Sequence, residues 1–199
     1  MAVATKRWTI EDLEAMEGDG TQYELLRGES IEVPGAKFEH GFLVGRLLIW
    51  FGNFVDQHGL GAIMNNCAFV IAHDPDSLLI PDFAFVRAER LPKDDEDWEI
   101  YLGPPDAVLE VVSPSDSAPE VHDKVLVYLE NGVRAVIVVW PRSRSVSVHR
   151  PGGVGREFNV GDVLEVEDVF PGLRLPVADI FRRARGQTPN QPQTTETAP

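Results

Sequence analysis

The segment LEVVSPSD (residues 109–116) places one ionisable residue, Glu110, inside an apolar run that is typical of the interior of a β-sheet. Side chains alternate between the two faces of a strand, so Glu110 shares its face with Val108 and Val112. A face that carries two valines is expected to be buried, and a buried ionised carboxylate costs several kcal/mol unless it has a partner. The sequence therefore predicts a partner for Glu110, which could be a salt bridge, a cluster of hydrogen-bond donors or a metal ion.

A second acid, Asp82, lies at the start of the strand-like run IPDFAFV (residues 80–86). If this run pairs with the run at 106–113, Asp82 and Glu110 can point to the same side with their Cβ atoms about 5 Å apart. Two carboxylates this close repel each other unless they share a proton or a cation. A hard divalent cation prefers oxygen ligands and would resolve both the repulsion and the burial.

The segments around these acids predict alternating strands and helices. A short helix is expected to begin at Thr9, and residues 23–33 alternate like a hairpin around Arg27-Gly28. Residues 40–57 carry apolar side chains at a 3.6-residue period, which indicates a long amphipathic helix. Further strands are expected at residues 62–71, 80–86, 106–113, 133–140 and 145–150, followed by two short strands and a helical turn between residues 157 and 181. His73–Asp76 and Gly152–Gly155 are interpreted as turns.

The clearest helix lies between the strands at 106–113 and 133–140. Ser117 and Glu120 match a capping box, and Asn131-Gly132 end the pattern. A strand, a helix of this length and another strand form a βαβ unit. The sequence therefore predicts a mixed α/β (α+β) fold.

Lys124 lies on this helix, three residues after Val121 and four before Tyr128, so it flanks the apolar face. An ammonium group there could stabilise developing charge on a phosphate or orient an attacking water. The competing interpretation is that Lys124 extends to solvent or pairs with Asp123 or Glu120 on its own helix. The residues alone leave both interpretations open.

Composition sets wider limits. At 199 residues and 43% hydrophobic content, one domain is expected over residues 1–185, followed by a disordered Pro/Thr/Gln-rich tail at 186–199. No apolar run reaches the roughly 18 residues of a membrane helix, and the N-terminus lacks a signal peptide's apolar region, so a cytoplasmic protein without membrane contact is expected. The acidic run at 94–97 predicts a solvated loop, and Cys67, the single cysteine, is expected to be buried and inert.

Six short motifs occur in a characteristic order. They are YELLRGE (23–29), His40 with GRLL (45–48), IPDFAFV (80–86), LEVVSPSD (109–116), KVLVYLENGVRAVIVVW (124–140) and FPGLRLP (170–176). Together they resemble the PD-(D/E)xK nuclease superfamily, and more narrowly its large bacterial branch of restriction-endonuclease-like proteins of unassigned role. The resemblance runs from Trp8 to about Phe181. It implies a restriction-endonuclease-like mixed central sheet flanked by helices, with extra N-terminal and C-terminal β-hairpins.

The resemblance also implies an activity, which is Mg²⁺-dependent (or Mn²⁺-dependent) hydrolysis of phosphodiester bonds in nucleic acid, with DNA expected rather than RNA. Asp82 and Glu110 would hold the metal with the backbone carbonyl of Val111, and Glu24, which matches the branch's first acid, would be a further ligand or support one. His40 matches the branch's helix histidine and is a candidate catalytic residue. The metal would lower the pKa of a bound water and polarise the phosphate.

One departure from the superfamily pattern concerns the lysine. It is expected two residues after Glu110, on the same strand, but Val112 occupies that position. In this branch the lysine has moved to the following helix, so its role of steering the attacking water is carried over to Lys124. Relatives also suggest a homodimer, which an enzyme that cuts two strands would need.

Other interpretations stay open. Asp82 and Glu110 could belong to a purely structural ion pair, and the fold could serve as a catalytically inactive binding or regulatory module. The net charge of −14 favours the module because it opposes binding to polyanions, although local basic groups or bound cations can override the overall field. The basic residues available to DNA are Arg142, Arg144 and Arg150 near one hairpin, and Arg182, Arg183 and Arg185 near the end. A two-carboxylate glycosidase fits less well, because a lysine beside the acids suits phosphate chemistry.

Overall fold

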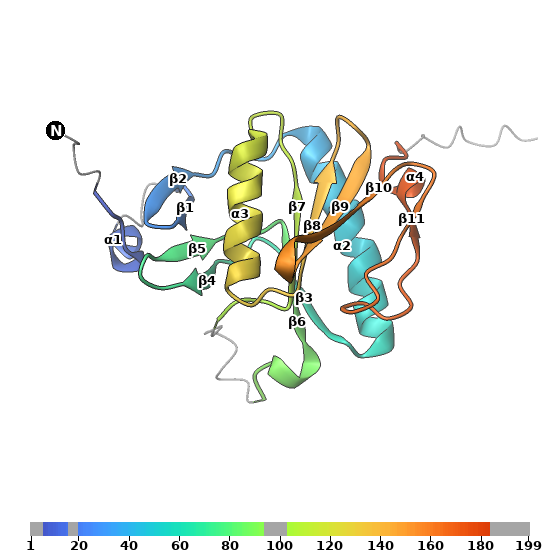
Figure 1. Cartoon of the computed structure of the whole chain (residues 1–199), viewed down its shortest axis with the longest axis horizontal. Coiled ribbons are helices and arrows are strands. Elements are labelled where there is room, and N and C mark those ends of the chain that lie inside the picture. Colours follow the sequence, from blue (N-terminus) through green and yellow to red (C-terminus); the bar gives the residue numbers. More distant parts are fainter. Residues whose placement is uncertain (1–5, 16–19, 94–102, 184–199) are drawn as a thin grey trace, which may run out of the picture.

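A six-stranded mixed sheet forms the centre of the computed structural model, which describes residues 6–15, 20–93 and 103–183 (Figure 1). Its strands lie in the order β10-β9-β8-β7-β6-β3. Their bounds are β3 Gly61–Met64, β6 Phe83–Arg87, β7 Ala107–Val111, β8 Ala135–Trp140, β9 Ser145–Arg150 and β10 Val154–Phe158. The predicted tail at 186–199 and the acidic run at 94–97 lie outside the described residues.

The centre of this sheet is the predicted βαβ unit. Strands β7 and β8 pair in parallel, with Glu110 opposite Val138, and helix α3 (Ala118–Glu130) connects them. The capping box of Ser117 and Glu120 begins this helix, as the sequence predicted. All other pairs in the sheet are antiparallel. Strands buried on both faces need apolar residues in consecutive positions, which explains the unbroken run AVIVVW of β8.

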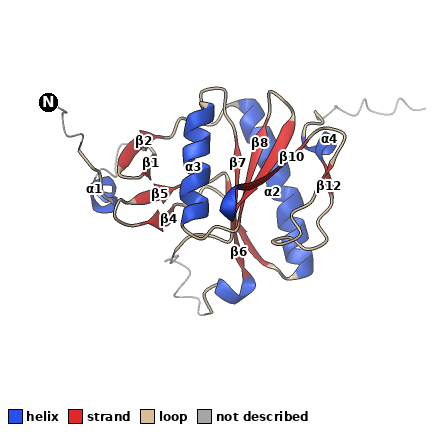
Figure 2. Cartoon of the chain, in the orientation of Figure 1, coloured by secondary structure: helices blue, strands red, loops and turns tan. Residues whose placement is uncertain are grey.

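Two helices cover opposite faces of the sheet (Figure 2). Helix α2 (Phe38–His58) packs on the face that carries Phe83, Phe85 and Leu109, and it ends at Gly59, whose φ of 60° provides a left-handed cap. Helix α3 packs on the other face, against residues such as Val108 and Val136. Because side chains alternate along β7, Glu110 lies on the α3 face, next to Val108.

A second sheet of four strands lies beside α3, in the order β2-β1-β5-β4 (Figure 1). Its strands are β1 Tyr23–Leu26, β2 Glu29–Glu32, β4 Phe69–Ala72 and β5 Ser77–Leu79. Strands β1 and β2 form the predicted N-terminal hairpin, and Leu25 pairs with Leu78 of β5. The hairpin therefore does not stand alone, because β5 joins it to the chain that leads into the central sheet.

The remaining elements are short. Thr9 caps α1 (Ile10–Glu14) as predicted, and 3₁₀ turns follow β6 (η1, Ala88–Arg90) and β9 (η3, Pro151–Gly153). Near the C-terminus, β11 (Val163–Leu164) pairs with β12 (Leu175–Pro176), and α4 (Val177–Ile180) follows. Buried residues of this C-terminal part join the core on the α2 side, among them Phe170 and Ile180.

Two predictions for residues 62–71 were wrong. The run is not one strand, because β3 ends at Met64 in the central sheet and β4 begins at Phe69 in the other sheet. Asn66, with a φ of 55°, turns the chain between them, a conformation that asparagine tolerates better than most residues. Cys67 lies in this turn and is exposed, so it is not the buried thiol that its apolar neighbours suggested.

The predicted fold class is confirmed: a mixed sheet flanked by helices carries additional hairpins at both ends of the chain. Among the described residues, no helix is both long and apolar enough to cross a membrane.

Candidate active site

The candidate site forms where the chain passes from the four-stranded sheet into the central sheet. Strand β5 ends at Leu79 and β6 begins at Phe83, so Asp82 is the last residue of the connection rather than part of the predicted strand. Strands β6 and β7 are antiparallel neighbours, as the sequence argument required, and Phe83 lies opposite Leu109. Asp82 and Glu110 therefore occupy the next opposed positions, at the end of this pair of strands.

The carboxylate of Asp82 is held through one oxygen. The backbone N–H of Val111 donates to Oδ2 at 2.6 Å, and Nε2 of His40 lies 3.2 Å from the same oxygen. The side chain of Asn65 donates to the backbone carbonyl of Asp82 at 2.9 Å, which fixes the main chain as well. Oδ1 of Asp82 makes no hydrogen bond or ion pair with a described residue.

His40 comes from the first turn of α2 and lies against Asp82 with its side chain only 14% exposed. The hydrogen bond to Asp82 and the negative charge of that carboxylate raise the pKa of His40 above its ordinary value, against the opposing effect of burial. Nδ1 of His40 is buried and has no hydrogen-bond partner among the described residues. The structure thus brings the predicted histidine to the predicted aspartate.

Glu110 obtains its hydrogen bond from helix α3. The hydroxyl of Tyr128 donates to Oε1 of Glu110 at 2.9 Å, and Oε2 makes no hydrogen bond or ion pair with a described residue. Burial raises the pKa of Glu110 to about 8, and the charges of Asp82 and Glu24 act in the same direction, whereas Lys124 and Tyr128 oppose them. Burial and the negative charge of Glu110 also raise the pKa of the Tyr128 hydroxyl, so this group keeps its proton and donates.

Lys124 turns inward and pairs with Glu24 of β1. Its Nζ lies 2.5 Å from Oε2 of Glu24, and the side chains are 25% and 2% exposed. Burial alone would lower the pKa of Lys124, but the charges of Glu110 and Glu24 outweigh it and raise the pKa above its ordinary value. The other oxygen of Glu24 accepts from the backbone N–H of Ile80 at 2.9 Å. The alternative pairing of Lys124 with Asp123 or Glu120 is therefore not what the structure shows.

These contacts leave two carboxylate oxygens for a ligand, Oδ1 of Asp82 and Oε2 of Glu110, whereas both oxygens of Glu24 are engaged. Within the described part of the chain, no group of three or more His, Cys, Asp and Glu side chains is arranged to hold a metal ion. Two carboxylates nevertheless suit Mg²⁺, because this ion keeps several of its waters and is commonly bound through one or two carboxylates. The mutual repulsion of Asp82 and Glu110 is a cost that a divalent cation would remove.

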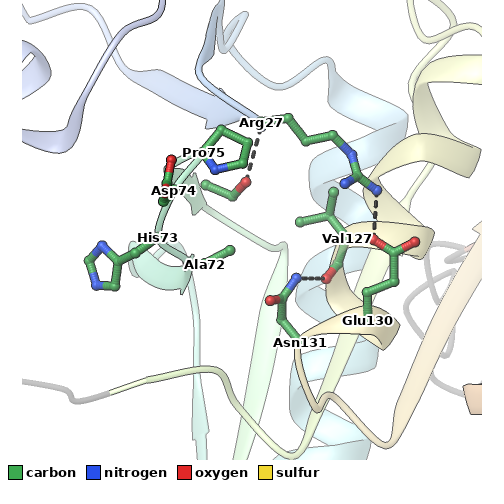
Figure 3. Close-up of a pocket in the computed structure, with 9 residues that line it drawn as sticks. Arg27, Ala72, His73, Asp74, Pro75, Val127, Glu130 and Asn131 are labelled. Carbon is green, nitrogen blue, oxygen red and sulfur yellow. Dashed lines mark hydrogen bonds and ion pairs between the residues drawn. The ribbon is translucent and has the colours of Figure 1, made fainter.

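The pocket in Figure 3 is separate from this site. It has a volume of about 160 Å³ and lies between the turn at residues 73–75 and the C-terminal end of α3, where Arg27 and Glu130 face each other. None of the described residues that line it is a predicted site residue. This pocket therefore carries no part of the candidate site.

The arginines that the sequence analysis named as available to DNA differ in their contacts within the chain. Arg150 makes two hydrogen bonds to the carboxylate of Asp168, and Arg182 pairs with Asp179. Arg144 lies over the ring of Phe181, with 6.0 Å between its guanidinium carbon and the ring centroid. Arg185 lies outside the described residues. At least two of these arginines are thus engaged by acids of the same chain.

Sequence reasoning missed three contacts of the site. The sequence pattern predicts a core position for Tyr128 and a strand position for Asn65, and it gives no indication that Lys124 pairs with Glu24. A signal existed for Tyr128, because a residue four positions after Lys124 lies on the same helix face. The pairing of Lys124 with Glu24 joins residues a hundred positions apart, and periodicity does not report such contacts.

The fold and the site define the class of protein. A mixed sheet with a βαβ unit at its centre, and two acids at the end of adjacent strands, is a restriction-endonuclease-like arrangement, and the predicted PD-(D/E)xK membership is confirmed. A family model described as "Putative restriction endonuclease" (Uma2) matches residues 10–178, and the chain belongs to this family. It is thus a member of a nuclease family.

Among solved structures, the chain is similar to one from Anabaena variabilis described as a "putative nuclease belonging to DUF820". The TM-score is 0.78 at 20% sequence identity, and the match covers 87% of this chain and 97% of the other. This likeness supports the fold. No curated protein matches the chain.

Proposed function

We propose that this protein is a nuclease that hydrolyses phosphodiester bonds with the help of Mg²⁺ or Mn²⁺, and that its substrate is DNA. One observation carries the proposal: Asp82, just before β6, and Glu110 of β7 occupy the next positions in the register of this strand pair, and each keeps one carboxylate oxygen free of hydrogen bonds and ion pairs with described residues. A purely structural pair of acids would be expected to use both oxygens of each carboxylate, as Glu24 does.

The residues that would hold the metal are Asp82 and Glu110, with the backbone carbonyl of Val111 as a further oxygen. A bound Mg²⁺ supplies a water of lowered pKa and polarises the phosphate. Glu24 fits the supporting role better than that of a ligand, because its two oxygens already bind Lys124 and the backbone of residue 80.

Lys124 would contribute a fixed positive charge. Its raised pKa keeps the ammonium protonated, so it cannot serve as a general base near neutral pH. A protonated lysine instead stabilises the negative charge that develops on the phosphate and orients the attacking water by hydrogen bonding. Glu24 holds this ammonium in place, and the exposed quarter of the side chain leaves it accessible to a substrate.

His40 would act on Asp82. It contacts the oxygen that Val111 also binds, so the two groups together fix the rotation of the carboxylate and leave Oδ1 to the metal. Outer contacts of this kind commonly orient metal ligands.

The proposal includes two further expectations. DNA must approach a chain of net charge −14, so a metal bound by the acids would also reduce the local repulsion of the phosphate. A homodimer is expected for cleavage of both strands, and sedimentation equilibrium of the purified chain tests it. A sedimenting mass of 22.1 kDa would show a monomer instead.

The deciding experiment combines metal binding with cleavage. We expect Mn²⁺ at a hundredfold excess over its Kd to stabilise the protein by about 2.7 kcal/mol, which corresponds to a rise in Tm of roughly 5–10 °C for a chain of this size. Asp82→Asn and Glu110→Gln should each abolish this rise. In a plasmid-nicking assay with Mg²⁺, both variants and Lys124→Met should lose at least about 100-fold in rate.

The outcomes separate the candidate functions. Metal binding without nicking of DNA or RNA would favour the catalytically inactive binding module. A wild-type protein whose Tm does not respond to either metal would refute the metal site itself. Nicking that survives in Lys124→Met would remove the lysine from the mechanism while leaving the two acids in place.

A further inference from the structure

We propose that Tyr128 is a positioning residue, whose hydroxyl fixes the carboxylate of Glu110 so that the second oxygen is available to the metal. This inference rests on the proposed function, because it concerns the same site. Nothing in the sequence motifs assigns the tyrosine such a role, and its place on the apolar face of α3 is equally typical of a core residue.

The first observation is that the ring of Tyr128, and not its hydroxyl, fills the core. The ring of Tyr128 is fully buried in the core between α3 and the central sheet, together with Val108, Val136 and Val138. A phenylalanine would fill the same space except for one oxygen atom. A buried hydroxyl without a partner is costly, so its presence at this position requires an acceptor.

The second observation is the identity of the acceptor. The hydroxyl donates to Oε1 of Glu110 at 2.9 Å, and it is the only hydrogen-bond donor to this carboxylate among the described residues. A glutamate side chain has three rotatable bonds, and packing alone leaves the last of them weakly determined. The hydrogen bond selects one rotation of the carboxylate and engages one oxygen only.

The third observation is a parallel with the other acid. Oδ2 of Asp82 accepts from the backbone of Val111 and contacts His40, while Oδ1 stays free. Tyr128 holds Glu110 in the same manner, through one oxygen. Two acids at the end of adjacent strands, each fixed through one oxygen, form a prearranged pair of ligands, which is what tight binding of a divalent cation requires.

The connection through α3 gives the tyrosine a second link to the site. Lys124 and Tyr128 are four residues apart, so one face of the same helix places both the ammonium and the hydroxyl. Lys124 binds Glu24 and Tyr128 binds Glu110. Helix α3 therefore positions the groups that hold these two acids.

The test uses the full chain and the variant Tyr128→Phe, which removes only the hydroxyl. We expect the Kd for Mn²⁺, measured from free Mn²⁺ by electron paramagnetic resonance, to rise about 10- to 100-fold, the usual effect of losing an outer contact to a metal ligand. A crystal structure of the variant should show the Glu110 carboxylate rotated or in several conformers. If the variant does not fold, 4-fluorophenylalanine at position 128 fills the space of the hydroxyl without donating.

The matched control is Val125→Ala, a change on the same buried face of α3 that removes packing but no hydrogen bond or ion pair of Glu110. Its Kd for Mn²⁺ should stay within about twofold of the wild type, because the hydrogen bond that orients Glu110 is kept. A purely structural tyrosine predicts the opposite result, in which Tyr128→Phe behaves like Val125→Ala.

Failure of this inference is distinct from failure of the proposed function. Unchanged Mn²⁺ affinity and an unmoved Glu110 in Tyr128→Phe would overturn the positioning role, while metal binding by the wild type would still stand. If the wild type binds no Mn²⁺, the proposed function fails, and the conformation of Glu110 in the two crystal structures alone decides whether Tyr128 positions it.

Discussion

Among the described residues, two ion pairs join the N-terminal hairpin to helix α3, and they differ in burial and in position along the helix. Glu24 of β1 pairs with Lys124 in the middle of the helix, with side chains 2% and 25% exposed. Arg27, in the turn after β1, pairs with Glu130 at the end of the helix, with side chains 49% and 53% exposed. The same two elements are thus connected once in the interior and once at the surface.

The difference in burial bears on how much each ion pair contributes to stability. An exposed pair is screened by water and contributes little to stability, whereas a buried pair must recover the desolvation of two charges. Because well-packed apolar residues usually stabilise a fold at least as well as a buried ion pair, stability alone does not explain Glu24 and Lys124. Glu24 and Lys124 lie beside Glu110, and under the proposed function they would supply the fixed positive charge that the site needs.

The largest expected effect is that of Glu24→Gln, which tests the interior pair. The substitution keeps the side chain's shape and an acceptor for the N–H of residue 80, but it leaves the ammonium of Lys124 without its direct partner. We expect a loss on the order of 3 kcal/mol in the free energy of unfolding, measured by urea denaturation at pH 7. A loss below about 1 kcal/mol would place this pair in the same class as the surface pair.

The double variant Glu24→Gln with Lys124→Met is the control for this prediction. It removes both charges, so we expect stability to return close to that of the wild type. Nicking activity should not return, because the ammonium itself is gone. A double variant that is both stable and active would break the link between the interior pair and catalysis.

The sequence predicts more of the fold than of the contacts within the candidate site. Helices α2 and α3 were predicted to within a few residues, because their apolar spacing, the Ser117 cap and the glycine after α2 are local signals. The division of residues 62–71 between two sheets was missed, although Asn65-Asn66 is a turn signal that the surrounding apolar residues obscured.

For the site, the sequence predicts that Asp82 and Glu110 lie close together with Lys124 nearby, but it does not predict their hydrogen-bond partners. The pairing of β6 with β7 followed from alternation, and the resemblance to a known family added Glu24 and His40. The partners of these groups come from other elements: Tyr128 from a helix face, Asn65 from a turn, and the N–H of Val111 from the backbone. Backbone donors and long-range side-chain contacts leave no pattern in one sequence.

The pH dependence of stability tests the interior region further, because Glu110, beside the pair of Glu24 and Lys124, has a raised pKa. Burial raises the pKa of Glu110 to about 8 in the folded protein, from the ordinary value of about 4.5 that the unfolded chain would have. Between these values the folded protein retains a proton that the unfolded chain releases, so stability should fall as the pH rises from about 5 to 8 in EDTA. His40, with its raised pKa, contributes in the same direction.

Glu110→Gln is the matched control for the pH series, since glutamine does not titrate. In this variant the fall in stability between pH 5 and 8, measured by urea denaturation, should be clearly smaller than in the wild type. Metal binding requires the ionised carboxylate, so the affinity of the wild type for Mn²⁺ should increase with pH up to about 8. A wild type and variant with equal pH dependence would show that Glu110 ionises normally in the folded protein.

The smallest expected effect is that of Glu130→Gln, the same chemical change made at the surface pair. Both side chains are about half exposed, so the pair is worth at most about 1 kcal/mol. Glu130 is also the last residue of α3, where the helix dipole disfavours a negative charge, so its removal offsets part of that loss. Urea denaturation should show a change within about 0.5 kcal/mol, which shrinks further in 1 M salt, and nicking should be unchanged. A loss of stability as large as that of Glu24→Gln would show that the surface pair also holds the hairpin to α3. The interior pair would then need no explanation beyond this structural role.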